Sequence, residues 1–241
     1  MKLFKWVVLF ILLSGSVLAA DDIKDNDASK QDKEQIEKQL RFFSKEAFTA
    51  LRNGEYDYSV KMFEKYLEIK DDNPKIYEYL SQVYTKLEKR PEAIGALRKA
   101  VELNPNYITG YFLLGKLYRD IGYYDDSIEC FKKYLAKKKD PNVLFELGLT
   151  YERTNKLDDA KEIYKSVILV KPNHAEAHFS LGLLLFRELK FDEALESIQR
   201  AIDFDPDNPL YGIYYNKVLD QRKQSSTPSK QLPKVVENDG D

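Results

Sequence analysis

Few residues of this chain have the types and spacing that catalysis or metal binding requires. Its two histidines, His174 and His178, are four residues apart and could share one helix face as metal ligands. His174, however, follows Pro172 in an expected loop, and His178 takes the place of an aromatic residue in a core stripe. Because no third ligand is specified, we predict no metal site.

The single cysteine and the carboxylates are no better candidates for a catalytic group. Cys130 cannot form an intrachain disulfide, and it stands where other segments have small or apolar residues, so we interpret it as a mostly buried hydrophobe. The carboxylates are scattered over expected helix surfaces, and no pair is specified as acid and base. The sequence therefore predicts no catalytic residue, no cofactor and no enzyme.

The composition favours a packed helical protein. Hydrophobic residues make up 43% of the 241 residues and charged residues 32%, which is enough apolar material to bury a core. The 17 tyrosines and 13 phenylalanines have rings that pack well between helices. Lys and Arg number 38 against 40 Asp and Glu, and this balance argues against a nucleic-acid partner.

The elements that must position any binding residue recur every 33 or 34 residues. Leu114-Gly115-x-x-Tyr118 returns as Leu147-Gly148-x-x-Tyr151 and as Leu181-Gly182-x-x-Leu185, and Leu80-Ser81-x-x-Tyr84 is a weaker copy. A second small residue follows each glycine or serine after twelve positions. We divide this region into five repeats, namely 40–73, 74–107, 108–140, 141–174 and 175–208.

Each repeat is predicted to contain two helices. Apolar residues three and four positions apart lay one stripe along the first helix. The Gly or other small residue in that stripe lets the second helix approach closely, and the small residue of the second helix is its counterpart. Proline is expected to end the second helix because it cannot supply an interior N–H.

This pattern resembles the tetratricopeptide repeat, a helix-turn-helix unit of about 34 residues. The resemblance covers residues 40–208 and implies an all-α fold, a right-handed α-solenoid of helix-turn-helix repeats. Residues 209–223 have apolar residues at helical spacing, which predicts the C-terminal capping helix that such arrays need. Residues 224–241 are polar and acidic, and we expect a disordered tail.

Residues 1–20 have the order of a secretory signal peptide. Lys2 and Lys5 precede an unbroken apolar run that starts at Trp6, and small residues close the segment at Ala20. An uncleaved single-pass membrane anchor is the alternative, but the 15 residues from Trp6 to Ala20 fall short of the about 20 that a spanning helix needs. Residues 21–39 are expected to be a flexible linker and helix lead-in. Export of a chain with one cysteine suits a bacterial periplasm.

In the family that the repeats resemble, the first helices line a concave groove that holds a peptide or helix of a partner. Positions two, five, nine and twelve of each first helix form a face apart from the core stripe. Phe recurs at position five in three successive repeats, and basic residues recur just past position twelve, so we predict an apolar trough with a basic rim. The predicted partner-binding residues are Phe112, Lys116, Arg119, Phe145, Leu149, Arg153, Phe179, Leu183, Phe186 and Arg187.

Alternative interpretations of these side chains stay open. The phenylalanines could pack against the helix of the next repeat, and the basic residues could simply lie near the negative end of each first helix. Chaperone-binding members of the family clamp a carboxylate with Lys and Asn at positions five and nine. Phe145 and Leu149 stand there in repeat four, and the other repeats do not match either, so that activity is not transferred.

These features predict an exported, non-enzymatic scaffold in the cell envelope that binds a peptide or helical segment of a protein partner. A structural self-assembly module that forms homo-oligomers is the second hypothesis, and a small-ligand binder or accessory subunit of an envelope complex is the third. No nucleic-acid partner is expected. Membrane contact is expected only if the signal segment stays uncleaved.

Overall fold

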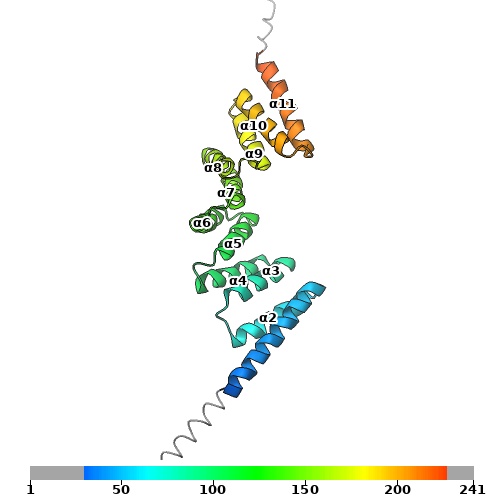
Figure 1. The fold of residues 1–241 in the computed structure, drawn as a ribbon, viewed down its shortest axis with the longest axis vertical. Coiled ribbons are helices and arrows are strands. Elements are labelled where there is room, and N and C mark those ends of the chain that lie inside the picture. Colours follow the sequence, from blue (N-terminus) through cyan, green and yellow to red (C-terminus); the bar gives the residue numbers. More distant parts are fainter. Residues whose placement is uncertain (1–29, 227–241) are drawn as a thin grey trace, which may run out of the picture. The chain divides into compact units, whose positions relative to one another are not determined.

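The computed structural model describes residues 30–226, and these residues form eleven helices and no strand (Figure 1). The first helix covers residues 30–53. The helices that follow are α2 (Tyr56–Ile69), α3 (Pro74–Lys86), α4 (Arg90–Leu103), α5 (Ile108–Asp120), α6 (Tyr124–Leu135), α7 (Pro141–Arg153), α8 (Leu157–Val170), α9 (Ala175–Arg187), α10 (Phe191–Phe204) and α11 (Pro209–Ser226). The predicted all-α class is confirmed, and the predicted signal peptide lies outside the described residues.

Two helix ends differ from the predicted segments. The first helix already begins at residue 30, in a region predicted to be linker and lead-in, because residues 30–39 are mostly Lys, Glu and Gln, which are strong helix formers. At the other end, α11 continues to Ser226 rather than ending at 223, since the chain offers no helix-breaking residue before Pro228. The rest of the predicted linker and tail lies outside the described residues.

The prediction that proline follows the end of each second helix is confirmed for α4, α8 and α10, whose C-cap residues are directly followed by Pro105, Pro172 and Pro206. Other prolines begin first helices. Pro74 and Pro141 occupy the first turns of α3 and α7, where a missing N–H costs nothing. The residue before each proline caps the helix: the Asn73 side chain accepts a hydrogen bond from the Lys75 N–H, and Asp140 accepts one from the Asn142 N–H, both at 3.0 Å. Proline and cap together fix where a repeat starts.

The turn between the two helices of each repeat contains one residue with a left-handed backbone. In chain order these residues are Gly54 (φ 81°), Glu88 (59°), Gly122 (84°), Asn155 (57°) and Leu189 (60°). They recur at the 33- or 34-residue period of the helices. Glycine adopts this conformation freely, whereas a side chain such as that of leucine is strained in it.

Close contact between paired helices depends on the glycine of the first helix. A methyl group added at Gly115 would lie 2.6 Å from the ring of Phe131, and one added at Gly148 would lie 2.5 Å from the ring of Tyr164. Both rings are fully buried, as is Ala160, the small residue opposite. The predicted role of the small residues in bringing the helices together is therefore confirmed.

The chain divides into two compact units at Gly110 and Tyr111, inside α5. In the first unit, α3 packs against α4 and α2 against α3, around buried Phe63, Leu80 and Val83. In the second unit, successive helices from α6 to α11 pack in order (Figure 1). No helix within residues 30–226 is long and apolar enough to cross a membrane.

Candidate protein-binding surface

The predicted binding residues all belong to the second unit, on the first helices α5, α7 and α9. Phe112 of α5 is half-buried, with its ring centroid 6.3 Å from that of Phe131 and 6.0 Å from that of Tyr134, both on α6. The Lys116 ammonium lies 5.6 Å from the Phe112 ring centroid. Phe112 thus packs against the second helix of its own repeat and keeps part of its surface exposed.

Phe145 on α7 repeats this arrangement. Its ring lies 5.6 Å from that of Tyr164 on α8 and 4.9 Å from the imidazole of His174, measured between centroids. Phe145 and Leu149, one turn later, are both half-buried. Their uncovered surface is available to a partner side chain.

Phe179 departs from this arrangement. It is only 8% exposed, and its ring lies 4.7 Å from that of Tyr211 and 5.4 Å from that of Tyr214. Both tyrosines belong to α11, which covers this side of α9. The expectation that Phe179 is a solvent-accessible anchor is therefore wrong, and the alternative of packing against the next helix describes it.

The other apolar predictions on α9 are partly accessible. Leu183 and Phe186 are half-buried, and the Phe186 ring lies 6.1 Å from that of Phe191 at the start of α10. We call the partly exposed residues among the predicted apolar binding residues of α5, α7 and α9 the first-helix face. It consists of Phe112, Phe145, Leu149, Leu183 and Phe186.

The basic residues do not form one continuous rim. Arg119 pairs with Glu146 of α7, and its side chain is only 18% exposed. It therefore joins two first helices and is not available to bind a partner protein. Arg153 and Arg187 are exposed in the last turns of α7 and α9. That position fits the alternative interpretation, in which they complement the negative helix ends.

His174 has a structural role that the sequence analysis missed. It caps α9 by accepting a hydrogen bond from the Ala177 N–H at Nδ1, over 3.3 Å, and the Glu176 carboxylate lies 3.1 Å from the same nitrogen. Burial lowers the pKa of His174 below its usual value, although Glu176 acts in the opposite direction. His174 occupies the same repeat position as the N-cap residues Asn73 and Asp140, and this position could have indicated its role. Histidine, however, is not among the residues that are usually recognised as N-caps.

The groups considered for chemistry lie apart from this face. Cys130 is buried, as predicted, and burial raises the pKa of its thiol to about 12, which disfavours the reactive thiolate. Within residues 30–226 no group of three His, Cys, Asp or Glu side chains could hold a metal ion.

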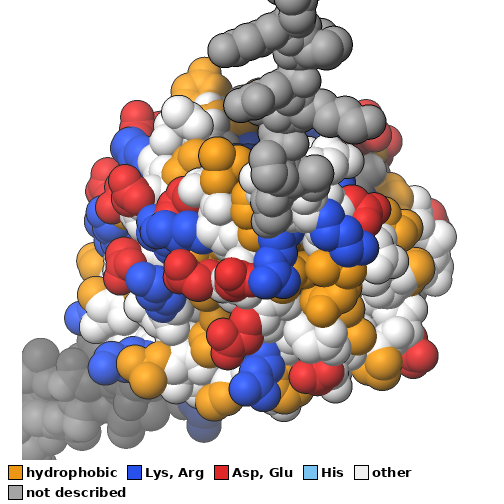
Figure 2. Space-filling model, turned by 90° about the horizontal axis from the view of Figure 1, so that it is seen from above, with side chains coloured by type: hydrophobic (Ala, Val, Ile, Leu, Met, Phe, Trp, Pro, Cys, Tyr) orange, Lys and Arg blue, Asp and Glu red, His pale blue; other side chains and the backbone are white. Residues whose placement is uncertain are grey.

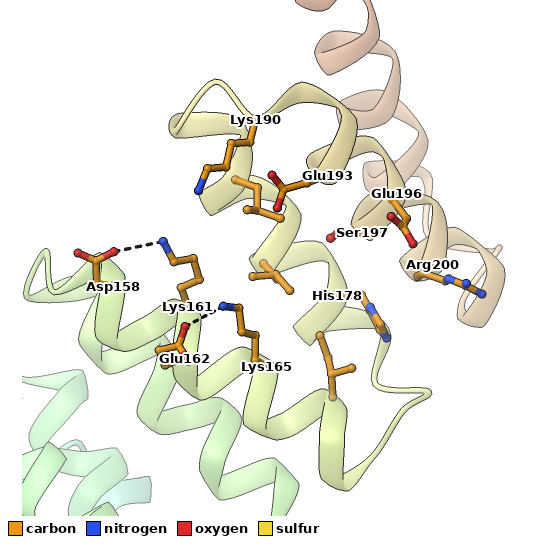
Figure 3. A pocket seen from close by; sticks show the side chains of 13 residues that line it. Asp158, Lys161, Glu162, Lys165, His178, Lys190, Glu193, Glu196, Ser197 and Arg200 are labelled. Atoms are coloured by element: carbon orange, nitrogen blue, oxygen red, sulfur yellow. Dashed lines mark hydrogen bonds and ion pairs between the residues drawn. The ribbon is translucent and has the colours of Figure 1, made fainter.

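A cleft of about 710 Å³ between α8 and the α9–α10 pair was not predicted (Figure 3). Leu181, Leu185 and Ile168 provide its apolar lining, while charged side chains of α8 and α10 stand around it. We call it the α8–α10 cleft. Sequence reasoning assigned these charged residues to solvated helix surfaces, so it gave no reason to look for a cavity between them.

The charges on the face drawn in Figure 2 are mixed in sign. Figure 2 shows acidic and basic side chains interspersed, with hydrophobic side chains between them. This pattern agrees with the near balance of 38 basic and 40 acidic residues. This face therefore presents no large area of one charge.

Paired antiparallel helices, a left-handed turn in each pair and recurrence every 33 or 34 residues define an all-α helical-repeat protein of the α-solenoid class. The family model described as "Tetratricopeptide repeat" matches residues 112–168 and 145–209, and one described as "TPR repeat" matches residues 82–122. These matches extend over more than half of the chain, and the protein belongs to the tetratricopeptide repeat family.

Individual relatives are distant. TPR repeat-containing protein YpiA of Bacillus subtilis is 22% identical over 175 residues, which cover 71% of this chain and 41% of YpiA. The chain spans less than half the length of the curated relatives it matches. The crystal structure of MamA shares the fold with a TM-score of 0.65 and 22% identity, covering 72% of this chain and 95% of that one. YrrB, described as a TPR protein with an unusual peptide-binding site, gives a TM-score of 0.60 at 21% identity, covering 73% of this chain and 88% of that one.

Proposed function

We propose that this protein is a non-enzymatic scaffold that binds a peptide or helical segment of a partner protein on the first-helix face. The observation that carries the proposal is the partial exposure of apolar side chains on three successive first helices. Phe145 and Leu149 on α7 and Leu183 on α9 keep uncovered surface, whereas α11 covers Phe179 beside them. Side chains at a regular helical period suit anchors at a regular spacing in the partner.

Aromatic anchors would supply most of the affinity. Truncation of a ring that becomes fully buried in an interface costs about 2 kcal/mol or more. Phe145 is held in one orientation by Tyr164 and His174, so little conformational freedom is lost when a partner covers its remaining surface. The peptide-binding site named for YrrB supports this kind of partner for a protein of the same fold.

We further propose that the five repeats of residues 40–208 act in the envelope of a bacterium. The signal-peptide pattern of residues 1–20 and the single cysteine support export to the periplasm. Intact mass of the protein purified from the envelope fraction tests this point. A chain that begins at Ala20 or Asp21 agrees with cleavage of the signal peptide. A chain that keeps Trp6 and sediments with membranes would instead support an uncleaved single-pass membrane anchor.

The binding proposal is tested by comparing two variants for partner recovery and melting temperature. Phe145→Ala with Leu183→Ala should lower recovery of a crosslinked partner at least tenfold, while the melting temperature falls less than in the control below because part of each side chain is already exposed. The matched control is Phe179→Ala, which should lower the melting temperature strongly through the lost contact with Tyr211.

Sedimentation of the purified chain separates binding from self-assembly. A monomer whose partner recovery depends on Phe145 supports the scaffold. A concentration-dependent oligomer that Phe145→Ala with Leu183→Ala dissociates would instead make a second copy of the chain the occupant of the first-helix face. Unchanged recovery from the double variant would remove the first-helix face as the binding site.

A further inference from the structure

The α8–α10 cleft opens beside the end of α11. Lys190 and Glu193 line both this cleft and a smaller hollow of about 380 Å³, and Arg222 and Ser225 of α11 line that hollow as well. Arg222 also pairs with Asp192 of α10, over 2.9 Å. Chain that continues past Ser226 therefore starts at the mouth of the cleft.

The cleft continues from this mouth between the second helices of two repeats. Figure 3 shows Lys190 and Glu193 at one end and Arg200 and His178 at the other. Its floor includes Leu181 and Leu185 of α9, so it is apolar along the middle. A volume of about 710 Å³ lies in the range of clefts that hold ligands or short chain segments.

The charges available for a ligand change sign along the cleft. Asp158 pairs with Lys161 over 3.2 Å, and Glu162 pairs with Lys165 over 2.8 Å. Among the residues that the structure describes, the cleft side chains of α10 that form no ion pair are Glu193 and Glu196, nearer the mouth, and Arg200, at the far end. A segment that entered at the mouth would meet unpaired acidic groups first and an unpaired basic group last.

The 15 residues that follow Ser226 have the opposite order of charges. Lys230 and Lys234 come first, Val235 and Val236 follow, and acidic residues begin at Glu237. Basic, apolar and acidic parts thus succeed one another in the direction in which the chain leaves α11. Each part is complementary to the part of the cleft that it would reach.

The length of this segment fits the path. Residues 227–234 reach at most about 26 Å when extended, at about 3.3 Å per residue. Glu193 and Arg200 are seven residues apart on α10, which separates them by only about 10 Å along the helix axis. The lysines can therefore reach Glu193 and Glu196 while Glu237 reaches Arg200.

We propose that residues 230–239 bind in the α8–α10 cleft of the same chain. Lys234 pairs with Glu193 or Glu196, Val235 and Val236 cover Leu181 and Leu185, and Glu237 pairs with Arg200. Because the segment is tethered at the mouth, its effective concentration is in the millimolar range, and contacts too weak to hold a free peptide are sufficient. These contacts define the segment that the cleft accepts as one with a basic, an apolar and an acidic part in that order.

Disulfide trapping in the full chain tests the proposal. In a Cys130→Ala background, Ser197→Cys places a thiol in the cleft lining and Val236→Cys places one in the segment. The matched control replaces Ser197→Cys with Asn216→Cys, an exposed position on α11 that the same segment can also reach. Under mild oxidation, the cleft pair should form an intrachain disulfide at least ten times faster than the control pair.

Charge reversal provides the second arm. Arg200→Glu should reduce the trapping rate of the cleft pair severalfold, and Glu237→Arg in the same chain should restore it. Arg98→Glu, an exposed position on α4, is the control that should change nothing. Equal trapping at Ser197→Cys and Asn216→Cys, disulfides formed only between chains, or no response to Arg200→Glu would each overturn the proposal.

Discussion

Leu189 has a strained backbone position, because a leucine adopts there the left-handed conformation that Gly54 and Gly122 adopt in the equivalent turns. Leu189→Gly is expected to raise stability by about 1 kcal/mol, since the relief of the left-handed strain exceeds the added freedom of glycine in the unfolded chain. Thermal melts measure the change. Leu189→Ala is the control, because it shortens the side chain and keeps the strain; a similar gain from alanine would assign the effect to the 68% exposed leucine side chain instead.

At the scale of single residues, the sequence predicted the features that follow from the regular spacing of apolar and small residues. The close approach of the second helix at Gly148 was expected from the recurring small residue, although the side chain that a methyl group there would meet is the ring of Tyr164. The burial of Phe179 was one of two interpretations that the repeat pattern left open, because the rings that cover it belong to α11, outside the repeated pattern. The ion pair of Arg119 with Glu146 was missed for a similar reason, since it joins two repeats rather than positions within one.

At the scale of the helix, the cap of α9 makes stability depend on pH. His174 accepts the Ala177 N–H only when Nδ1 is unprotonated, and burial lowers the pKa of His174 below the unfolded value of about 6.5. The unfolded chain then binds more protons than the folded one in this window. The contribution of His174 is complete above about pH 6.5 and is lost as the pH falls through the lower pKa of the folded state.

His174→Asn tests this dependence, because asparagine caps α3 at the equivalent position and does not titrate. The difference in melting temperature between pH 7 and pH 5 should be smaller in His174→Asn than in the wild type. At pH 7 the two proteins should differ by less than about 1 kcal/mol, since the cap is kept. An identical pH dependence in both would show that other groups cause it.

At the scale of the molecule, stability depends on contacts between neighbouring helices, which a single buried charge can break. Ala160 on α8 is fully buried in its helix pair, and Ala160→Arg would place an unpaired charge there at a cost of about 3–5 kcal/mol. We expect loss of cooperative unfolding in the second unit, measured by far-ultraviolet circular dichroism during a thermal melt.

Lys156→Ala is the control for this substitution. Lys156 pairs with Asp125 over 3.5 Å, but both side chains are exposed, so the pair contributes less than about 1 kcal/mol. Small and equal losses for Ala160→Arg and Lys156→Ala would show that the helix register is wrong. The general order of the helices followed from the sequence, whereas the α8–α10 cleft did not, because it depends on how two repeats stack.

The tyrosines of α11 also cover one end of the stacked repeats at α9. Tyr211 is 2% exposed on the side of α9 where a further repeat would otherwise be placed. A chain without α11 would expose Phe179 in an apolar surface, to which the first repeat of another molecule could bind. Contacts of that head-to-tail kind use two different surfaces, so they generate rings or filaments rather than two-fold dimers. One helix of 18 residues therefore covers the surface of α9 through which copies of the chain would otherwise associate end to end.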